Sequence, residues 1–223
     1  MLVLIILTTG YGVYAFGLIG TPKPKNLGIN YTEADWQTSQ GKSQIKTEIV
    51  AATVPLEAIK YQGSHPVTQS FTSQELTAEA NKRTWQYLPF KNIQIRINQD
   101  GSTEVSGNLN TSIVTEYLTA VGGLSLKEAE IVKSYVPIQG MPTFYLKGAG
   151  SVENNKISLN LQSVQVGPVS IPTGYINQYQ STVVTFLNDR LQKWDGVKID
   201  SLNFNSSQLN FSGTLPNTEI VAK

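Results

Sequence analysis

The stretch that decides the fold lies at residues 91–109 and reads KNIQIRINQDGSTEVSGNL. Its first half places an isoleucine at every second position up to Ile97, which is typical of a strand that buries one face. Asp100-Gly101 is a dipeptide that favours a tight turn between two strands. Residues 102–109 then predict the returning strand. The stretch therefore predicts an antiparallel β-hairpin.

A helix is predicted immediately before this hairpin. Thr72 and Glu75 have the spacing of a capping box, in which each residue satisfies a free backbone N–H at the start of the helix. We expect this helix to run from Thr72 to about Tyr87. The hairpin then has a helix beside it in sequence that can cover its apolar face.

The same order of elements recurs in the second half of the chain. Asn81-Lys-Arg83 before the first hairpin matches Asn188-Asp-Arg190 before a second one, at 197–204 and 209–215. The first hairpin closes with Ser106-Gly-Asn-Leu109 and the second with Ser212-Gly-Thr-Leu215. The recurrence predicts two related helix–hairpin halves. Chance similarity between two generic units remains the alternative.

Other elements follow from the same signals. Thr32 is a plausible N-cap and Gly41 a plausible C-cap of a short helix. Gly107 and Gly213 lie inside predicted strands, where glycine marks a bulge or a close approach. Further helices are predicted at about 111–121, 126–135 and 171–194, an extended stretch at 44–60, a loop at 62–66 and strands over 144–148 and 157–166. The pattern predicts an α+β fold, with a curved antiparallel sheet packed on helices.

The N-terminal segment predicts a membrane anchor. Met1 to Ile19 reads MLVLIILTTGYGVYAFGLI and carries no charged side chain. At ~1.5 Å per residue, a helix of about 19 residues is long enough to cross a hydrocarbon core of ~30 Å. A cleaved signal peptide and a buried helix remain alternatives, although a basic leading segment and an A-x-A cleavage site are missing.

The chain is accordingly divided into an anchor at 1–19, a linker at 20–30, one domain at 31–218 and a short tail at 219–223. The domain is rich in Asn, Gln, Ser and Thr and in strand patterns, which suits an extracytoplasmic location. Lys23 and Lys25 argue weakly for the opposite orientation. We expect a single-pass protein of a bacterial cell membrane, with its domain outside the cytoplasm.

The composition excludes several kinds of chemistry. The 223 residues include no cysteine and one histidine, so disulfides, thiolate ligands and multi-histidine metal sites are excluded. The formal net charge of +1 shows none of the basic excess that is typical of nucleic-acid-binding proteins. We expect no cofactor, no metal and no nucleic-acid partner.

The candidate site residues are few. His65 is the one possible imidazole base, but no nucleophile or activating carboxylate can be assigned to it, and a position in a loop is the favoured interpretation. Arg83 and Arg190 occupy the repeated position, where they either bind an anionic head group or pair at a helix end. Asp100 is the one acidic residue of its turn, which argues against a calcium loop. No catalytic residue is predicted, and no ligand-binding residue is assigned.

Five strings of the sequence stand out, at residues 27–35, 71–78, 93–107, 144–155 and 199–216. Together they resemble a family of uncharacterised, membrane-anchored envelope proteins of bacteria. The resemblance implies an anchored extracytoplasmic domain without assigned catalytic residues. More remotely, a helix before a hairpin of this kind is similar to the tubular lipid-binding (TULIP-like) proteins, in which a curved sheet around a long helix holds acyl chains.

The function expected from these observations is binding without catalysis. The leading hypothesis is a membrane-anchored protein that binds an apolar or lipid ligand. The alternative is an envelope scaffold or accessory subunit that contacts protein partners. A hydrolase of envelope polymers that works through scattered carboxylates is a third possibility, which no spacing of carboxylates supports.

Overall fold

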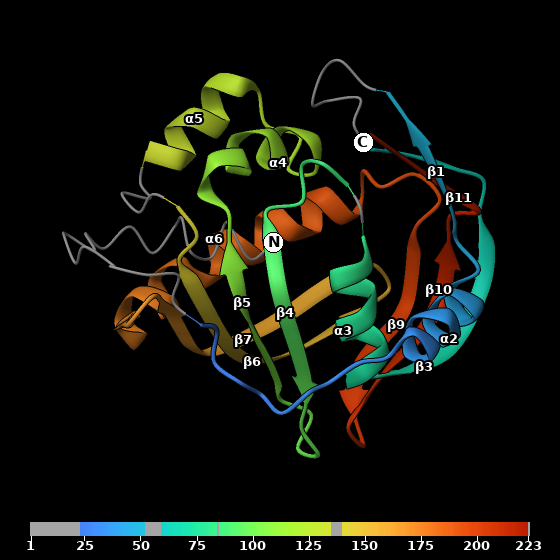
Figure 1. Ribbon diagram of the computed structural model, residues 1–223, viewed down its shortest axis with the longest axis horizontal. Helices are drawn as coiled ribbons and strands as arrows, with labels where there is room; N and C mark the ends of the chain where they lie inside the picture. The colour runs from blue at the N-terminus through green and yellow to red at the C-terminus, as the bar shows by residue number, and fades with distance from the viewer. Residues whose placement is uncertain (1–22, 52–58, 84, 135–139, 223) are drawn as a thin grey trace.

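The computed structural model describes residues 23–51, 59–83, 85–134 and 140–222, and these form a large antiparallel sheet packed against helices (Figure 1). The α+β fold class is therefore confirmed. The eight-stranded sheet has the order β3-β10-β9-β6-β5-β4, and β7 pairs with β6 and with β8. Its strands are β3 (His65–Thr72), β4 (Phe90–Ile97), β5 (Thr103–Leu109), β6 (Thr143–Glu153), β7 (Lys156–Val166), β8 (Val169–Ser170), β9 (Lys198–Asn205) and β10 (Gln208–Leu215).

A second, three-stranded sheet has the order β1-β11-β2. It consists of β1 (Lys46–Val50), β2 (Ile59–Gln62) and β11 (Thr218–Ala222), with β1 parallel and β2 antiparallel to β11. The central strand comes from the segment that the sequence predicts as a tail. That prediction is wrong, because Val221 is buried against Trp85 and Ile59 and the strand is paired on both edges.

Five helices and one 3₁₀ turn complete the described part of the chain. In Figure 1, α4 and α5 lie together at one end of the large sheet, whereas α2 and α3 lie near β3 and β10. They are α2 (Glu33–Ser43), α3 (Ser73–Lys82), η2 (Thr111–Ile113), α4 (Val114–Ala120), α5 (Leu126–Ser134) and α6 (Thr173–Leu191). The capping box predicted at Thr72 and Glu75 forms, and the predicted N-cap Thr32 also forms one, with Asp35.

The helix ends differ from the prediction. Gly41 lies inside α2, and Gln44 is the C-cap, in the left-handed conformation. Helix α3 ends at Lys82 rather than near Tyr87, because the chain turns there to bury Trp85 beneath the small sheet. Helix α6 ends at Leu191, and Trp194 beyond it is partly exposed. Tyr135, the predicted end of α5, lies outside the described residues.

The predicted hairpin forms as β4 and β5. Gly101 has φ of 80°, and the Asn98 N–H donates to the Ser102 carbonyl at 2.8 Å across the turn. Gly213 lies at a register shift between β9 and β10, as a bulge requires. Gly107 instead makes room for neighbours, since a Cβ there would lie 2.5 Å from Cδ1 of Ile93.

Helix α3 covers the edge of β4 through side-chain hydrogen bonds. Ser73, Thr77 and Asn81, spaced four residues apart, accept from successive outward N–H groups of the strand, those of Ile97, Ile95 and Ile93. Helix α6 covers the edge of β7 in the same way. Gln180 and Asn188 accept from the N–H groups of Leu161 and Ile157 at 2.8 Å. The helices thereby satisfy strand edges that would otherwise be free.

The main core lies between the large sheet and α4 and α6. Phe144, Val164, Leu118 and Val183 are almost fully buried there. A smaller cluster around Phe71, Leu191 and Phe211 extends it under β9 and β10. Burial of these side chains is the main favourable term in holding the helices on the sheet.

The segment predicted as a linker is docked from Lys25 onward. Leu27 is buried, its N–H donates to Gln94 at 2.7 Å and its carbonyl accepts from Arg96. Lys25 lies 3.7 Å from the ring centre of Tyr145. We call residues 25–28 the strap. The predicted anchor at 1–19 lies outside the described residues, and none of the helices that the structure describes is long and apolar enough to cross a membrane.

Candidate functional site

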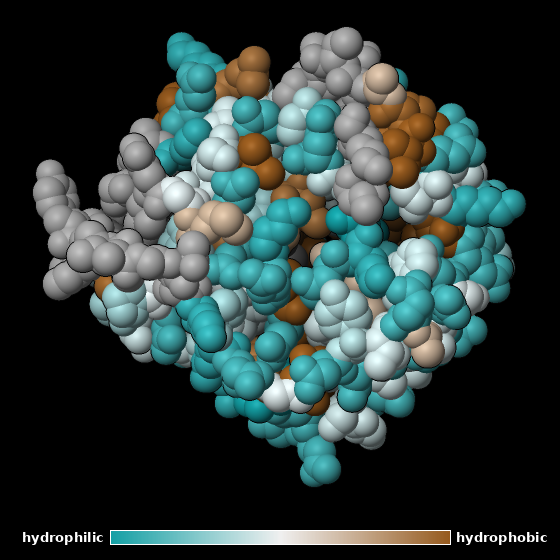
Figure 2. Space-filling view, in the orientation of Figure 1, coloured by the Kyte–Doolittle hydropathy of each residue, from teal (hydrophilic) through white to brown (hydrophobic). Residues whose placement is uncertain are grey.

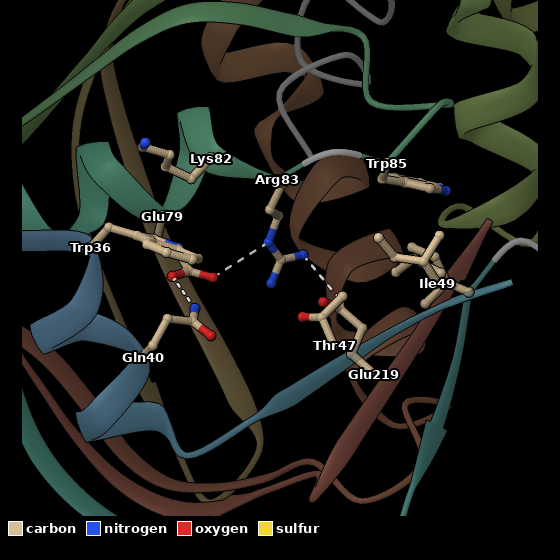
Figure 3. A pocket seen from close by; sticks show the side chains of 11 residues that line it. Trp36, Gln40, Thr47, Ile49, Glu79, Lys82, Arg83, Trp85 and Glu219 are labelled. Atoms are coloured by element: carbon tan, nitrogen blue, oxygen red, sulfur yellow. Dashed lines mark hydrogen bonds and ion pairs between the residues drawn. The ribbon is translucent and has the colours of Figure 1, made fainter. Parts of the chain in front are cut away.

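A pocket of about 380 Å³ opens between α2, α3 and the small sheet (Figure 3). It is lined by an apolar wall on one side and by charged and amide side chains on the other. Five separate segments of the chain contribute to it. The lining residues are Trp36, Gln40, Thr47, Ile49, Ile59, Glu79, Lys82, Arg83, Trp85, Glu219 and Val221.

The apolar wall is built on Trp85. This side chain is buried and stacks at a tilt on Tyr117, with ring centres 5.8 Å apart. Ile59 and Val221 from the small sheet pack against the same cluster. Ile49 on β1 is 52% exposed and forms the rim, and apolar atoms gather over β1 at the upper right of Figure 2. The wall therefore passes from a rigid aromatic base to an open aliphatic edge.

Arg83 stands at the charged side between two carboxylates. Its Nη1 donates to Glu219 Oε1 at 3.1 Å, and its Nε lies 3.7 Å from Glu79 Oε1. Burial alone would lower the pKa of Arg83, but the charges of Glu219, Tyr61 and Glu79 outweigh it and raise that pKa. The guanidinium is thus a fixed charge that pairs with both carboxylates.

Glu219 is the most deeply buried charge of the pocket. It is 4% exposed and lies on β11, the central strand of the small sheet. Burial raises the pKa of the neighbouring Tyr61, and the Glu219 carboxylate raises it further, so that the phenol stays neutral. An ionised acid in such a position needs its partner, because an unpaired buried charge costs several kcal/mol, on the order of 3–5.

The outer charges of the pocket are paired as well. Lys82 forms an ion pair with Glu33 at 2.6 Å and lies 5.8 Å from the ring centre of Trp36. Glu79 Oε2 accepts from the Gln40 amide at 2.7 Å and from Ser39. The pocket therefore holds several charges but little unbalanced charge.

The buried indole nitrogen of Trp85 has no hydrogen-bond partner within the described ranges, and Figure 3 shows it turned away from Arg83. Three further polar atoms of the pocket make no hydrogen bond to any described residue. The first is Arg83 Nη2, which Figure 3 shows pointing into the space between Gln40 and Thr47. The second is the amide oxygen of Gln40, which faces away because the amide nitrogen donates to Glu79. The third is the hydroxyl of Thr47, on β1. One donor, one acceptor and one hydroxyl are thus open to a ligand.

The structure does not bring the other predicted candidates into this pocket. His65 lies in β3 rather than in a loop, and its ring nitrogens contact Asn217 Oδ1 and the Ser43 carbonyl. Asp100 accepts from the backbone and hydroxyl of Ser102 in its own turn. Arg190 lies against Gly123, and its Nε is buried without a hydrogen-bond partner among the residues we can place.

Glu104 forms a separate buried cluster with the strap. Arg96, Tyr145 and Asn98 donate to its carboxylate. Burial alone would raise the pKa of Glu104, but these hydrogen bonds outweigh it and lower that pKa to about 2. Both oxygens of this carboxylate thus accept hydrogen bonds from neighbouring side chains, which ties the strands of the large sheet together here.

Of the pocket residues, the sequence pointed to Arg83 alone, through its place in the recurring helix–hairpin unit. Trp36, Gln40, Thr47 and Glu219 carried no signal, since they come from segments that meet in three dimensions only. No group of three or more His, Asp or Glu side chains that could hold a metal exists within the ranges that the structure covers. Comparisons with family models, with curated proteins and with solved structures find no match to this chain.

Proposed function

We propose that this chain is a membrane-anchored, extracytoplasmic binding protein of the bacterial envelope, and that the pocket at Arg83 and Trp85 takes an amphipathic, lipid-like ligand. The observation that carries the proposal is the division of the pocket into an apolar wall and a polar side whose hydrogen-bonding atoms are partly unpaired. Sites for small molecules have this composition, mostly apolar with a few convergent polar groups.

The pairing of the charged groups with one another supports binding without catalysis. A general acid is a side chain, such as His, Glu or Asp, that is placed to give a proton to the reacting group. Glu79 and Glu219 are both paired with Arg83, at 3.7 and 3.1 Å. His65, the other possible acid–base group, is engaged at β3. Because these side chains are already engaged with partners, the pocket favours recognition over proton transfer.

The ligand site lies outside the helix–sheet core. A TULIP-like protein would hold acyl chains between the sheet and its long helix, and in this chain that space is occupied by Phe144, Val164, Val183 and Leu187. The proposed site is instead formed where α2 and α3 meet the small sheet. The lipid-like ligand of the proposal thus binds at the side of the domain.

The finer features of the predicted fold belong to the same proposal. Asn81 and Asn188, equivalent in the recurring units, both bond to the backbone of an edge strand, which supports two related halves of a curved sheet. The position of the strap supports the prediction of a membrane anchor. A chain docked at Leu27 leaves few residues between the domain and a membrane span at 1–19. The domain would then stay close to the membrane surface.

The test compares two substitutions on neighbouring positions of β1. Thr47 lines the pocket, and Glu48 points to the opposite face of the strand. The full chain, purified from a bacterial host, is analysed by native mass spectrometry for bound small molecules. We expect the wild type and Glu48→Phe to retain a ligand and Thr47→Phe to lose it. Absence of any ligand in all three, together with no binding of added monoacyl lipids, would overturn the proposal.

A scaffold function is the second candidate, and the exposure of β1 favours it. All five residues of this edge strand are exposed, including Ile49 and Val50. An exposed edge can accept a strand from a partner protein. A photo-crosslinking amino acid at Glu48 in intact cells tests this function: a stoichiometric protein adduct supports it, and an uncrosslinked chain contradicts it.

A further inference from the structure

We infer that the pocket selects an uncharged polar head, and so binds a short neutral amphiphile, with a carbonyl or hydroxyl head, in preference to the fatty acid or amine of equal length. This inference rests on the proposed binding function and adds the chemical class of the ligand. It follows from the balance of charges around Arg83, the hydrogen-bonding atoms left open and the volume of the pocket.

An anionic head is disfavoured because Arg83 already forms ion pairs with two carboxylates. Its guanidinium lies 3.1 Å from Glu219 and 3.7 Å from Glu79, so that two carboxylates share one cation. A third carboxylate placed at Nη2 would lie close to both. Like charges brought together in a half-buried site repel strongly. Arg83 is therefore paired at the end of its helix, one of the two roles that the sequence left open, and is no free anion receptor.

A cationic head is disfavoured for the complementary reason. Lys82 already lies beside the ring of Trp36, which is the aromatic face that an ammonium group would use. Glu79 Oε2 accepts from both Gln40 and Ser39. An ammonium group entering the pocket would meet Lys82 and Arg83 at its walls. The ring of Trp36 and the Glu79 carboxylate are therefore already engaged, and Trp85, the other ring that lines the pocket, belongs to the apolar wall.

A neutral head fits the atoms that remain. Arg83 Nη2 can donate to a carbonyl or hydroxyl oxygen, while the Gln40 oxygen and the Thr47 hydroxyl can accept from an amide or hydroxyl hydrogen. A primary amide, an ester of glycerol or an alcohol satisfies these atoms without adding charge. Filling them also removes the cost of leaving polar atoms unpaired when the ligand excludes water.

The volume limits the apolar part. A pocket of about 380 Å³ lies near the lower end of the range for small-molecule sites, ~300–1,000 Å³. It accommodates one short chain or ring along Trp85, Ile59 and Ile49. A lipid with two long chains exceeds it. The fitting ligand is therefore a single-chain neutral amphiphile.

The test measures binding of octanamide, octanoate and octylamine to the full chain in lipid nanodiscs at neutral pH, by calorimetry, with empty nanodiscs as the blank. All three probes share one chain length and differ in the charge of the head. We expect octanamide to bind about ten-fold more tightly than either charged probe. Glu79→Gln should lower the ratio of octanamide affinity to octanoate affinity about three-fold, because one repelling carboxylate is removed. Glu130→Gln, on the exposed face of α5, should leave it unchanged.

The outcomes separate the inference from the function on which it rests. Octanoate or octylamine binding as tightly as octanamide overturns the neutral-head inference and leaves the binding function standing. An unchanged preference in Glu79→Gln also overturns it, since the selectivity would then not come from the carboxylates. If none of the probes binds and no ligand co-purifies, the proposed function itself fails.

Discussion

Asn81 and Ile93 exchange two hydrogen bonds, from Asn81 Nδ2 to the Ile93 carbonyl at 2.8 Å and from the Ile93 N–H to Asn81 Oδ1 at 3.0 Å. The asparagine amide thus takes the place of a neighbouring strand at the edge of β4. Thr77 and Ser73 continue the series along the same helix. Helix α3 is held to the sheet by backbone polar groups as well as by apolar contact.

Replacement of this asparagine should destabilise the whole domain. Asn81→Ala leaves the Ile93 N–H and carbonyl unpaired beneath the helix, which costs about 1–3 kcal/mol in the free energy of unfolding. Urea unfolding followed by circular dichroism measures the loss. Gln74→Ala, at an exposed position of the same helix, is the control and should change little. Equal stability of the two variants would contradict the role assigned to Asn81.

Glu104 should make the stability depend on pH in the acid range. Its pKa is lowered from 4.5 to about 2 in the folded chain, so its stabilising contribution is complete above the unfolded value and is lost as the pH falls toward 2. The shift corresponds to about 3 kcal/mol. The difference in unfolding free energy between wild type and Glu104→Gln should therefore shrink between pH values of about 5 and 2. A difference that stays constant over this range would rule out the effect.

The strap should detach when its buried side chain is shortened. Leu27→Ala removes the apolar contact that accompanies the hydrogen bonds to Gln94 and Arg96, a loss of about 2–3 kcal/mol at a buried leucine. Hydrogen exchange of the amides of residues 25–28 should accelerate, while the amides of β5 stay protected. Ile29→Ala, a partly exposed neighbour, serves as the control. Unaltered exchange in Leu27→Ala would show that the hydrogen bonds suffice to hold the strap.

Gly123 should tolerate no side chain. It has φ of +60°, and a Cβ would lie 2.2 Å from Nη1 of Arg190. Gly123→Ala should therefore lower the free energy of unfolding by about 1–3 kcal/mol. Gly174→Ala, inside α6 with no atom within 4 Å of its Cβ position, should be neutral or stabilising by up to about 1 kcal/mol. Thermal unfolding distinguishes the two, and equal melting temperatures would contradict the prediction.

The predictions from sequence succeeded where the signal was local. The hairpin at Asp100-Gly101 and the capping boxes at Thr32 and Thr72 depend on side chains and backbone within four residues of each other. The predicted ends of α2 and α3 were wrong, because tertiary contacts set them. Trp85 is drawn under the small sheet, and its burial outweighs the tendency of the preceding residues to continue the helix.

The pocket could not be predicted because its members are distant in sequence. Glu219 lies in a segment predicted as a tail, and Thr47 in a strand whose five residues are all exposed. Neither position has a pattern that indicates a partner. Only the parallel pairing of β1 with β11 brings Thr47 opposite Glu219, and α3 then places Arg83 against the carboxylate.

The order of residues along the chain was enough to establish the strand alternation, the turn, the helix caps and the absence of cysteine chemistry, since each depends on composition or on neighbours within one turn. The tertiary structure decided which charged groups are paired and which polar atoms are left without a partner. Arg83, for which the sequence left anion binding and pairing at a helix end as alternatives, is paired with Glu79 and Glu219 once the strands assemble. Electrostatic interactions depend on distance in space and on burial, and the sequence contains neither.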